Sequence, residues 1–424
     1  MSIQCIGLLL RRVIVGLVAG MLVQASIPTI GVSADSSEIE QLRRELAEHR
    51  KYVESLEKRL QTQEEKLAKD PGIEAGYDDG FFVKSKDKPF SLVVNGLGQF
   101  RYTLQSPVSG GHTNQSFDVV LGRLALSGHV FDPRLTYFTQ IQGSTLGNDN
   151  NITMLDWWMK WNFRPETGVQ AGRFILPYSR QFYTHPGNLM FADLSQADLS
   201  FNLPRAIGTN GSTKFGPFTF HGAFTNSIRA LDAPGQQNFG TQMAGLGRIE
   251  LDILKPYGYL ETSPKPVADP ELSIGLAGAY NPIDGTSSLQ NLVSGDTTAN
   301  VTLDLGYRWR GVSFQTAGYY RRDNYTTPGL GHGNDWGFYT QAGLFVIPER
   351  LEIAGNISGV QFDKLNVAGV NKRTTVYTFG VNYYLYGHNL KIQADYGYLD
   401  NVAFKGQPKA TDSNRFRLQS QFLF

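Results

Sequence analysis

The sequence contains a single cysteine, Cys5, among 424 residues. Cys5 precedes an apolar N-terminal run that we expect to be removed, so disulfides and thiol chemistry are excluded for the mature chain. Beyond residue 34 no stretch stays apolar for 18 residues, which excludes a membrane-spanning helix there. The formal net charge is only +1, so the basic footprint of a nucleic-acid-binding protein is missing. The seven histidines are scattered without metal-ligand spacing, and we expect neither a metal site nor a cofactor.

The N-terminus has the features of a secretion signal. Arg11 and Arg12 supply a positive region, and residues 13–23 form an apolar core. Val32-Ser33-Ala34 offers a small-residue cleavage site, so residues 1–34 are predicted to be a signal peptide. The alternative is a transmembrane anchor, for which the apolar core is too short.

Residues 35–70 are predicted to form a helix that assembles into a periplasmic coiled coil. Seam positions recur at spacings of three and four between positions rich in Glu, Lys and Arg: Ile39, Leu42, Leu46, His49, Val53, Leu56, Leu60, Gln63 and Leu67. A seam this narrow packs better against copies of itself than against a flat surface. The alternative is a solitary amphipathic helix lying on a domain, and the polar His49 and Gln63 weaken the seam.

The end of the chain alternates between two kinds of residue. One face carries Phe416, Leu418, Ser420, Phe422 and Phe424, and the other carries Arg415, Arg417, Gln419, Gln421 and Leu423. A period of two indicates a strand with two different environments. In a membrane β-barrel one face meets lipid and the other meets a watery lumen. The alternative for this segment alone is the edge strand of a soluble sandwich.

Sixteen alternating, aromatic-rich segments follow residue 90, and the connections between them alternate between short and long. This alternation is expected when tight turns lie at one end of a barrel and longer loops at the other. One connection breaks the rule, because the Pro-rich residues 255–270 are long where a short turn is due. With 20 Tyr, 26 Phe and 46 Gly, the composition also suits a barrel.

The predicted fold is therefore all-β, a 16-stranded antiparallel transmembrane β-barrel preceded by a short α-helical coiled coil. We assign residues 1–34 to the signal peptide, 35–70 to the coil, 71–89 to a linker or plug-side segment, and 90–424 to the barrel. Sixteen strands enclose a space wide enough for an aqueous channel, whereas eight would be filled by side chains.

The longest connection, residues 177–205, is too apolar to be a solvated loop. Its Leu189, Met190, Phe191 and Phe201 require burial, and the inner wall of the barrel is an available surface. A loop folded inward would narrow the pore. The alternative is packing on the barrel rim or on a neighbouring subunit.

Several motifs resemble the phosphate-selective porin O/P family. They are Gly76-Tyr-Asp-Asp-Gly-Phe-Phe82, Asn95-Gly-Leu-Gly-Gln-Phe-Arg-Tyr102, Arg123-Leu-Ala-Leu-Ser-Gly128, Gly172-Arg-Phe-Ile-Leu-Pro-Tyr-Ser-Arg180, Leu189-Met-Phe-Ala-Asp-Leu-Ser-Gln-Ala197 and Asn202-Leu-Pro-Arg-Ala-Ile-Gly208. The resemblance implies a homotrimeric sixteen-stranded outer-membrane porin with an inward-folded third loop and, in some members, a coiled coil before the barrel.

The resemblance does not by itself specify phosphate. Selective members line the constriction with a dense set of Arg and Lys, whereas here residues 177–205 contain Arg180 and Arg205, no lysine, and the opposing Asp193 and Asp198. The sequence therefore predicts passive diffusion of small hydrophilic solutes or ions with a weak anion preference. Inorganic anions such as phosphate are candidate solutes.

Charged residues on the strands are expected to face the lumen, because an Arg or Lys facing lipid at mid-depth costs roughly 2–4 kcal/mol. The candidates for the constriction and for anion contact are Arg180, Arg205, Arg173, Arg123 and Arg101. Further lumen-facing candidates are Arg308, Arg310, Arg415, Arg417, Lys391, Asp304 and Asp395. Each arginine could instead be paired with a lumen carboxylate.

Two other classes of function are alternatives. Ser179, His185 and Asp193 lie in one loop, but no nucleophile elbow accompanies them, so we expect no enzyme. The second alternative is a structural tether, in which the coil links the outer membrane to the cell wall and the barrel is only an anchor. Deleting a tether would cause membrane blebbing with solute uptake unchanged.

Overall fold

The computed structural model describes residues 36–69, 72–86, 90–146, 152–226, 228, 243–282, 295–329, 331–363, 373–402 and 411–424. The predicted signal peptide, residues 1–34, lies outside them. The chain divides into two units, Met1–Asp70 and Pro71–Phe424.

The first unit contains one described helix, α2 (Ser36–Lys69). Three of its seam side chains are exposed: Leu46 is 58%, Val53 52% and Leu60 59% exposed. No helix among the described residues is both long and apolar enough to cross a bilayer. Leu46, Val53, Leu56 and Leu60 therefore form an exposed apolar stripe on the part of the helix whose side chains are described.

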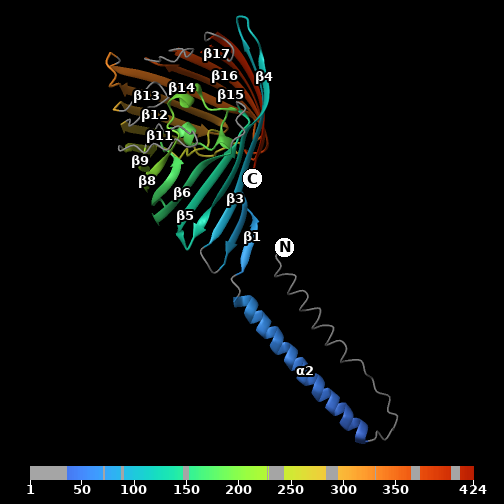
Figure 1. Cartoon of the computed structure of the whole chain (residues 1–424). Coiled ribbons are helices and arrows are strands. Elements are labelled where there is room, and N and C mark those ends of the chain that lie inside the picture. The colour runs from blue at the N-terminus through green and yellow to red at the C-terminus, as the bar shows by residue number, and fades with distance from the viewer. Residues whose placement is uncertain are drawn as a thin grey trace. The chain divides into compact units, whose positions relative to one another are not determined.

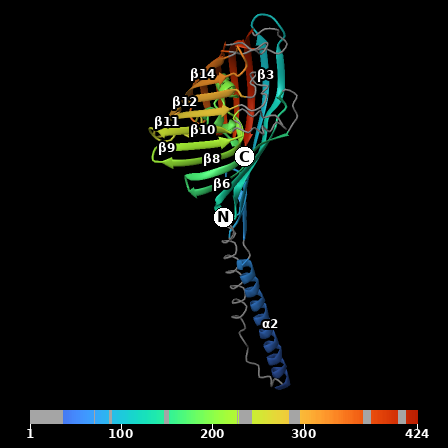
Figure 2. The same ribbon diagram turned by 60° about the vertical axis from the view of Figure 1, so that its left-hand side comes forward.

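The second unit is a closed antiparallel β-barrel, seen from two sides in Figures 1 and 2. Within the described residues it has the predicted sixteen strands, each paired with the next in sequence, and the last pairs with the first. The strands are β3 (Ser91–Pro107), β4 (Asn114–Val130), β5 (Asp132–Gly143), β6 (Ile152–Arg164), β7 (Thr167–Ile175), β8 (Arg205–Phe215), β9 (Phe218–Thr225), β10 (Ala244–Asp252), β11 (Glu271–Pro282), β12 (Thr297–Trp309), β13 (Val312–Asn324), β14 (His332–Ile347), β15 (Leu351–Gln361), β16 (Arg373–Tyr386), β17 (Leu390–Val402) and β18 (Thr411–Leu423).

A hairpin precedes the barrel where the sequence suggested a linker. Strands β1 (Ile73–Tyr77) and β2 (Phe81–Ser85) pair with each other, and β2 pairs with the start of β3. The ring of Phe81 meets the ring of the C-terminal Phe424 with 5.6 Å between centroids. The hairpin thus covers the seam at which the first and last barrel strands meet.

The alternation in β18 has the expected two faces. Arg417, Gln419 and Gln421 are at most 3% exposed, whereas Leu418 and Phe422 are each 44% exposed. The same pattern recurs along β12, where Asp304 is buried and Leu303 is 56% exposed. Polar side chains therefore point into the barrel and apolar ones point outward, as lipid on the outside requires.

The connections divide the barrel into two ends. Short connections at what we call the turn end are residue 131 and residues 165–166, 216–217, 310–311, 348–350 and 387–389. The other end, the loop end, carries the longer connections. Residues 253–270, between β10 and β11, are the long exception at the turn end that the sequence had indicated.

The close packing at the β3–β18 seam predicts that a larger residue at position 98 destabilises the barrel. A Cβ added there would lie 2.2 Å from the ring of Phe422 across the β3–β18 seam. Gly98→Ala should therefore displace this ring, which is 44% exposed, and lower the free energy of unfolding by about 1 kcal/mol, the low end of the cost of overpacking. Urea unfolding of the folded barrel in detergent measures this. Gly247→Ala, where no atom lies within 4 Å of the added Cβ, is the control, and equal midpoints for the two variants would refute the prediction.

Candidate pore-lining site

The connection between β7 and β8, residues 176–204, is here called the lumen loop. It contains the short helices α3 (Arg180–Tyr183) and α4 (Gln196–Phe201) and the 3₁₀ turn η2 (Pro186–Asn188). Ser179 and Ser195 cap the two helices by accepting hydrogen bonds from backbone N–H groups, which satisfies donors that a short helix leaves free.

The apolar side chains of the lumen loop are buried against the inner wall of the barrel. Phe201 stacks on Tyr319 of β13 with 5.8 Å between ring centroids, and Met190 and Phe191 cluster with Ala354 of β15. The loop lies within the ring of strands in both views (Figures 1 and 2). Burial of these apolar side chains stabilises the loop in its inward position through the hydrophobic effect, and it meets the need for burial that the sequence indicated.

Polar side chains of β16 and β17 hold the middle of the lumen loop. Lys391 Nζ donates to Leu189 O at 2.8 Å, and Asn382 Nδ2 donates to Met190 O at 2.7 Å. Both side chains are at most 1% exposed. Backbone carbonyls of the loop are thereby satisfied by the wall, as buried polar groups require.

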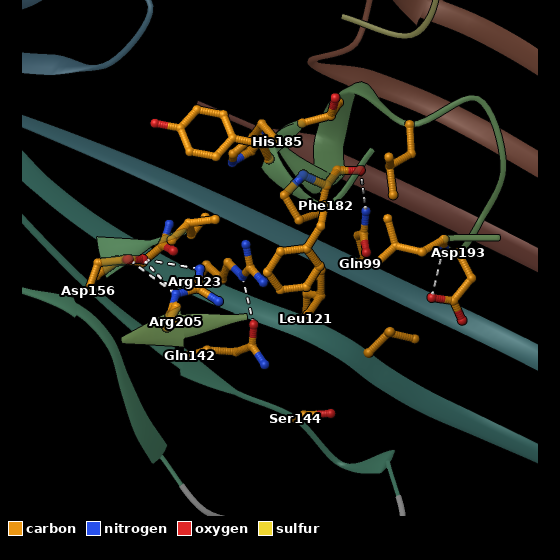
Figure 3. Close-up of a pocket in the computed structure, with 18 of the residues that line it drawn as sticks. Gln99, Leu121, Arg123, Gln142, Ser144, Asp156, Phe182, His185, Asp193 and Arg205 are labelled. Atoms are coloured by element: carbon orange, nitrogen blue, oxygen red, sulfur yellow. Dashed lines mark hydrogen bonds and ion pairs between the residues drawn. The ribbon is translucent and has the colours of Figure 1, made fainter. Parts of the chain in front are cut away.

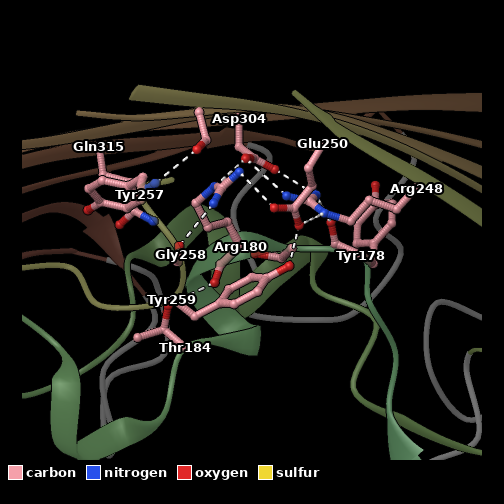
Figure 4. Close-up of polar contacts among 12 residues, drawn as sticks. Tyr178, Arg180, Thr184, Arg248, Glu250, Tyr257, Gly258, Tyr259, Asp304 and Gln315 are labelled. Atoms are coloured by element: carbon pink, nitrogen blue, oxygen red, sulfur yellow. Dashed lines mark hydrogen bonds and ion pairs between the residues drawn. The ribbon is translucent and has the colours of Figure 1, made fainter. Parts of the chain in front are cut away.

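A cluster of four charges joins the start of the loop to the wall (Figure 4). Arg180 Nε lies 2.6 Å from Asp304 Oδ1, and Arg248 Nη1 lies 2.7 Å from Asp304 Oδ2. Arg248 Nε lies 2.7 Å from Glu250 Oε1. The two guanidinium groups and two carboxylates balance, and all four side chains are buried. Arg180 is therefore an anchor of the loop and not an open anion contact.

A second cluster lies on the opposite side of the loop, around Asp193. Its carboxylate is 3.2 Å from both Arg101 and Arg417. Arg417 also pairs with Asp395, with 2.7 Å between Nε and Oδ1, while Arg101 Nη2 donates to the carbonyl of Ala192. The loop is thus fixed to β3 and β18 by charge-assisted hydrogen bonds.

A cavity of about 430 Å³ remains between the lumen loop and strands β3 to β8 (Figure 3). Charged residues on its wall are Arg101, Arg123, Arg205, Asp156 and Asp193. Aromatic side chains line it as well: Phe138, Trp158, Phe174, Phe182 and Tyr183. This cavity therefore lies to one side of the barrel and combines apolar with charged surface.

Arg123 carries the unbalanced charge of this cavity. Arg205 lies 3.1 Å from Asp156, and Arg101 is paired as described above, but the recorded partner of Arg123 Nε is the neutral Gln142, at 2.6 Å. No carboxylate within the described ranges lies at ion-pair distance from Arg123. Burial, aided by the charges of Arg123 and Lys391, lowers the pKa of His185 to about 4, so His185 adds no charge at neutral pH.

Most of the predicted inward-facing residues lie on the inner side. Arg101, Arg205, Arg308, Lys391, Asp304, Asp395 and Arg417 are all at most 5% exposed. Arg123 and Arg415 are half-buried on the same side, and Arg415 borders a separate small pocket beside Asp193 and Arg417. Of the five candidate constriction residues, Arg101, Arg123 and Arg205 line the cavity.

Arg180 lies in the cluster around Asp304 and does not line the cavity. Two predicted lumen-facing residues, Arg173 and Arg310, are not on the inner side. Arg173 pairs across the sheet with Trp157 and Ile207, which are 59% and 42% exposed. Cross-strand partners share a face, so the register puts Arg173 on the outer side, contrary to our expectation. Arg310 lies in the turn after β12 with φ 48° and is exposed, its guanidinium 4.8 Å from the ring of Trp309. The strand ends before Arg310, so alternation could not place it.

The three residues considered for hydrolysis are not arranged as a triad. Ser179 Oγ donates to Asp198, and His185 Nδ1 accepts from the backbone N–H of Gly187. Burial raises the pKa of Asp198 to about 7, although hydrogen bonds from Ser179 and Tyr319 act against this rise. Among the described residues no group of three or more His, Cys, Asp or Glu could hold a metal ion.

Sequence reasoning missed the inner role of residues 253–270. Tyr257, Glu261 and Thr262 of this segment are at most 1% exposed. The sequence features that could have indicated this inner position were the unusual length of the connection at the turn end and its aromatic residues. Without the register of the wall, nothing in the sequence indicated that this connection turns inward.

Comparisons with known proteins were informative only at the level of structure. No family model and no curated protein matches the chain. The anion-selective porin from Comamonas acidovorans is similar in structure, with a TM-score of 0.55, 13% identity, and coverage of 78% of this chain and 99% of that one. The outer membrane channel DcaP of Acinetobacter baumannii is also similar, with a TM-score of 0.55 and 13% identity, and the match covers 78% of this chain and 97% of that one.

Salmonella typhi OmpF, in a complex with daunomycin, is a third similar structure. It gives a TM-score of 0.55 and 13% identity, and the match covers 83% of this chain and all of that one. At such low identity the likeness establishes the porin-type barrel fold and nothing finer.

The charge cluster around Asp304 predicts that removing the Asp304 carboxylate strongly destabilises the folded protein. Asp304→Ala leaves the buried guanidinium groups of Arg180 and Arg248 with Glu250 alone. Removing one member of a buried ion network costs about 3–5 kcal/mol, so the thermal unfolding temperature should fall sharply. Asp132→Asn is the control, since the Asp132–Arg134 pair is largely solvated, and it should change nothing measurable. Unfolding at the wild-type temperature in Asp304→Ala would contradict this account.

Proposed function

We propose that this chain is an outer-membrane channel through which small hydrophilic solutes diffuse passively. The observation that carries the proposal is the 430 Å³ cavity between the lumen loop and strands β3 to β8. It lies inside a closed barrel whose outer face is apolar, and the barrel therefore needs no partner to satisfy its backbone in a bilayer. The porin-type fold agrees with this function.

The lumen loop supplies the narrowest part of the proposed path. Its buried apolar side chains and its two charge clusters hold it inside the barrel, where it occupies space that water would otherwise fill. Phe182, His185 and Leu194 of the loop face the cavity wall formed by the strands. Solute size would then be limited by the gap between the loop and this wall.

A weak preference for anions follows from the charges around this gap. Arg123 is not matched by a carboxylate of the described residues, whereas Arg101 and Arg205 are. A single uncompensated guanidinium in a narrow, partly desolvated passage attracts anions. The similar structures include the anion-selective porin from Comamonas acidovorans, which is consistent with this proposal. The paired arginines do not favour a dedicated phosphate site.

The exposed seam of α2 supports assembly through the helix. A stripe containing Leu46, Val53 and Leu60 is left in solvent in a single chain, and a coiled coil would bury it. We therefore propose a homotrimer in the outer membrane with the coil in the periplasm. A tether function would need an additional partner for the coil.

Selectivity should depend on Arg123. In reconstituted channels across a KCl gradient, the reversal potential of the wild type should show a slight anion preference. Arg123→Gln should reduce the anion-to-cation permeability ratio at least roughly two- to fivefold, because one charge at about 4 Å contributes about 1 kcal/mol in water and more where the passage is partly desolvated. Arg310→Gln removes an exposed arginine outside the cavity and should leave the ratio unchanged.

Three outcomes would oppose this proposal. A wild type that prefers cations, or an Arg123→Gln variant with wild-type selectivity, would contradict the role of Arg123. Saturation of the chloride current by micromolar phosphate would reveal a dedicated phosphate site. Absence of any current from folded protein would refute the channel itself.

Deleting residues 38–68 should weaken subunit assembly without closing the pore. The barrel retains its own closed hydrogen-bond ladder, whereas the coil loses its apolar seam. Native mass and crosslinking measure assembly, and single-channel current measures the pore. Monomers in the full-length protein, or loss of current in the deletion variant, would contradict the proposal. Leu46→Ala combined with Leu60→Ala is a milder variant with the same expected direction.

A further inference from the structure

Residues 253–270, here called the turn-end segment, enter the barrel from the end opposite to the lumen loop. They join β10 to β11 at the turn end, where the other connections are short. Short turns there are exposed at Arg310 and Glu349, but Tyr257, Glu261 and Thr262 are at most 1% exposed. A surface connection would not bury such polar side chains, so this segment has an interior role.

The wall of the barrel is built to receive the turn-end segment. Tyr257 covers Gly306 of β12 so closely that a Cβ at that position would lie 2.3 Å from the tyrosine ring. Arg308 donates to the carbonyls of Tyr257 and Leu260. Thr262 Oγ1 donates to Glu352 Oε1 of β15 at 2.6 Å.

The segment reaches beyond its own strands. The carbonyl of Thr262 lies 3.0 Å from Nε2 of His388, in the turn between β16 and β17. Ser313 of β13 donates to Thr262 Oγ1 at 3.3 Å. The segment therefore extends over the inner face from β10 toward β17, on the side away from strands β3 to β8.

The turn-end segment meets the lumen loop inside the barrel. Arg180 Nη1 donates to Gly258 O at 3.0 Å, as Figure 4 shows. Glu261 accepts hydrogen bonds from Gln181 Nε2 at 2.8 Å and from Met190 N at 2.6 Å. The rings of Tyr183 and Tyr259 lie 4.8 Å apart. These contacts join two segments that enter from opposite ends.

A small pocket of about 30 Å³ lies between the lumen loop and strands β14 to β18. The 430 Å³ cavity lies elsewhere. The strand residues that line it come from β3 to β8, and no residue of the turn-end segment lines either pocket. We infer that the turn-end segment is a second pore-narrowing element, which closes the β10–β17 side of the lumen and fixes the lumen loop, so that solutes pass only along β3 to β8. This inference rests on the proposed channel function and identifies which half of the barrel conducts.

The decisive variant removes the segment without opening the sheet. Asp252 pairs with Ser273 in the antiparallel register of β10 and β11, and Ile253 N donates to Leu272 O at 2.9 Å, so a two-residue turn can join the strands there. Replacing residues 254–271 by Asn-Gly should raise single-channel conductance roughly twofold or more, because a second aqueous path opens. Heat-modifiable migration in detergent gels confirms that the variant is folded.

Point variants keep the inference testable if the shortened barrel does not fold. Glu261→Ala removes the acceptor for Gln181 and Met190, and should increase current noise and the frequency of brief openings to higher conductance. Gln181→Ala and Glu261→Ala should be non-additive, since each removes a partner of the other, although Gln181 also contacts Gln341 and the backbone N–H of Ser195. Lys265→Ala, an exposed position of the same segment, is the control and should behave as wild type.

The outcomes separate this inference from the proposed function. If the wild type conducts but the folded shortened variant has the same conductance, the inference alone is overturned. Unchanged current in Glu261→Ala would overturn it as well. Wild-type channels that carry no current would overturn the channel function and this inference with it. Higher conductance in the shortened variant, with Lys265→Ala unchanged, would support both.

Discussion

The pairing of β18 with β3 is the interaction on which the rest of the structure depends. A bilayer offers no hydrogen-bonding partners, so a sheet can cross it only if it has no free edge. The backbone of Phe424 completes this closure by exchanging both hydrogen bonds with Gly96. Once the sheet is closed, each strand has one face toward lipid and one toward the lumen, and the alternation of side chains follows from this geometry.

The lumen then has to accommodate many charged groups at low solvent exposure. Burying an isolated charge is costly, so the inner arginines are found mainly in networks with carboxylates. Asp304 and Asp193 are the centres of two such networks. Asp304 of the wall binds Arg248 of the wall and Arg180 of the lumen loop, and Asp193 of the lumen loop binds the wall arginines Arg101 and Arg417. The same interactions that offset the cost of burial therefore position the loop, and they leave Arg123 as the uncompensated cation of the cavity.

The interior of the barrel is asymmetric as a consequence. Polar networks and apolar contacts accumulate between β10 and β18, where the lumen loop and the turn-end segment meet. The cavity lies against β3 to β8. In our proposal, a channel of this kind obtains its size limit from two segments that support each other, and its charge preference from the wall that they leave uncovered.

The sequence by itself determined the sixteen strands, because a period of two is a local property and the length of each connection can be read directly. It also determined which face of most strands is polar, as Arg417 and Asp304 illustrate. Only the tertiary structure decided which arginines are open. Arg180 is neutralised by Asp304, 124 positions further along the chain, and no local pattern contains that pairing. Arg173 faces outward because register, not its own neighbours in sequence, sets the side on which it lies. The inward path of residues 253–270 likewise depends on Gly306 and Arg308, which become its neighbours only when the barrel has closed.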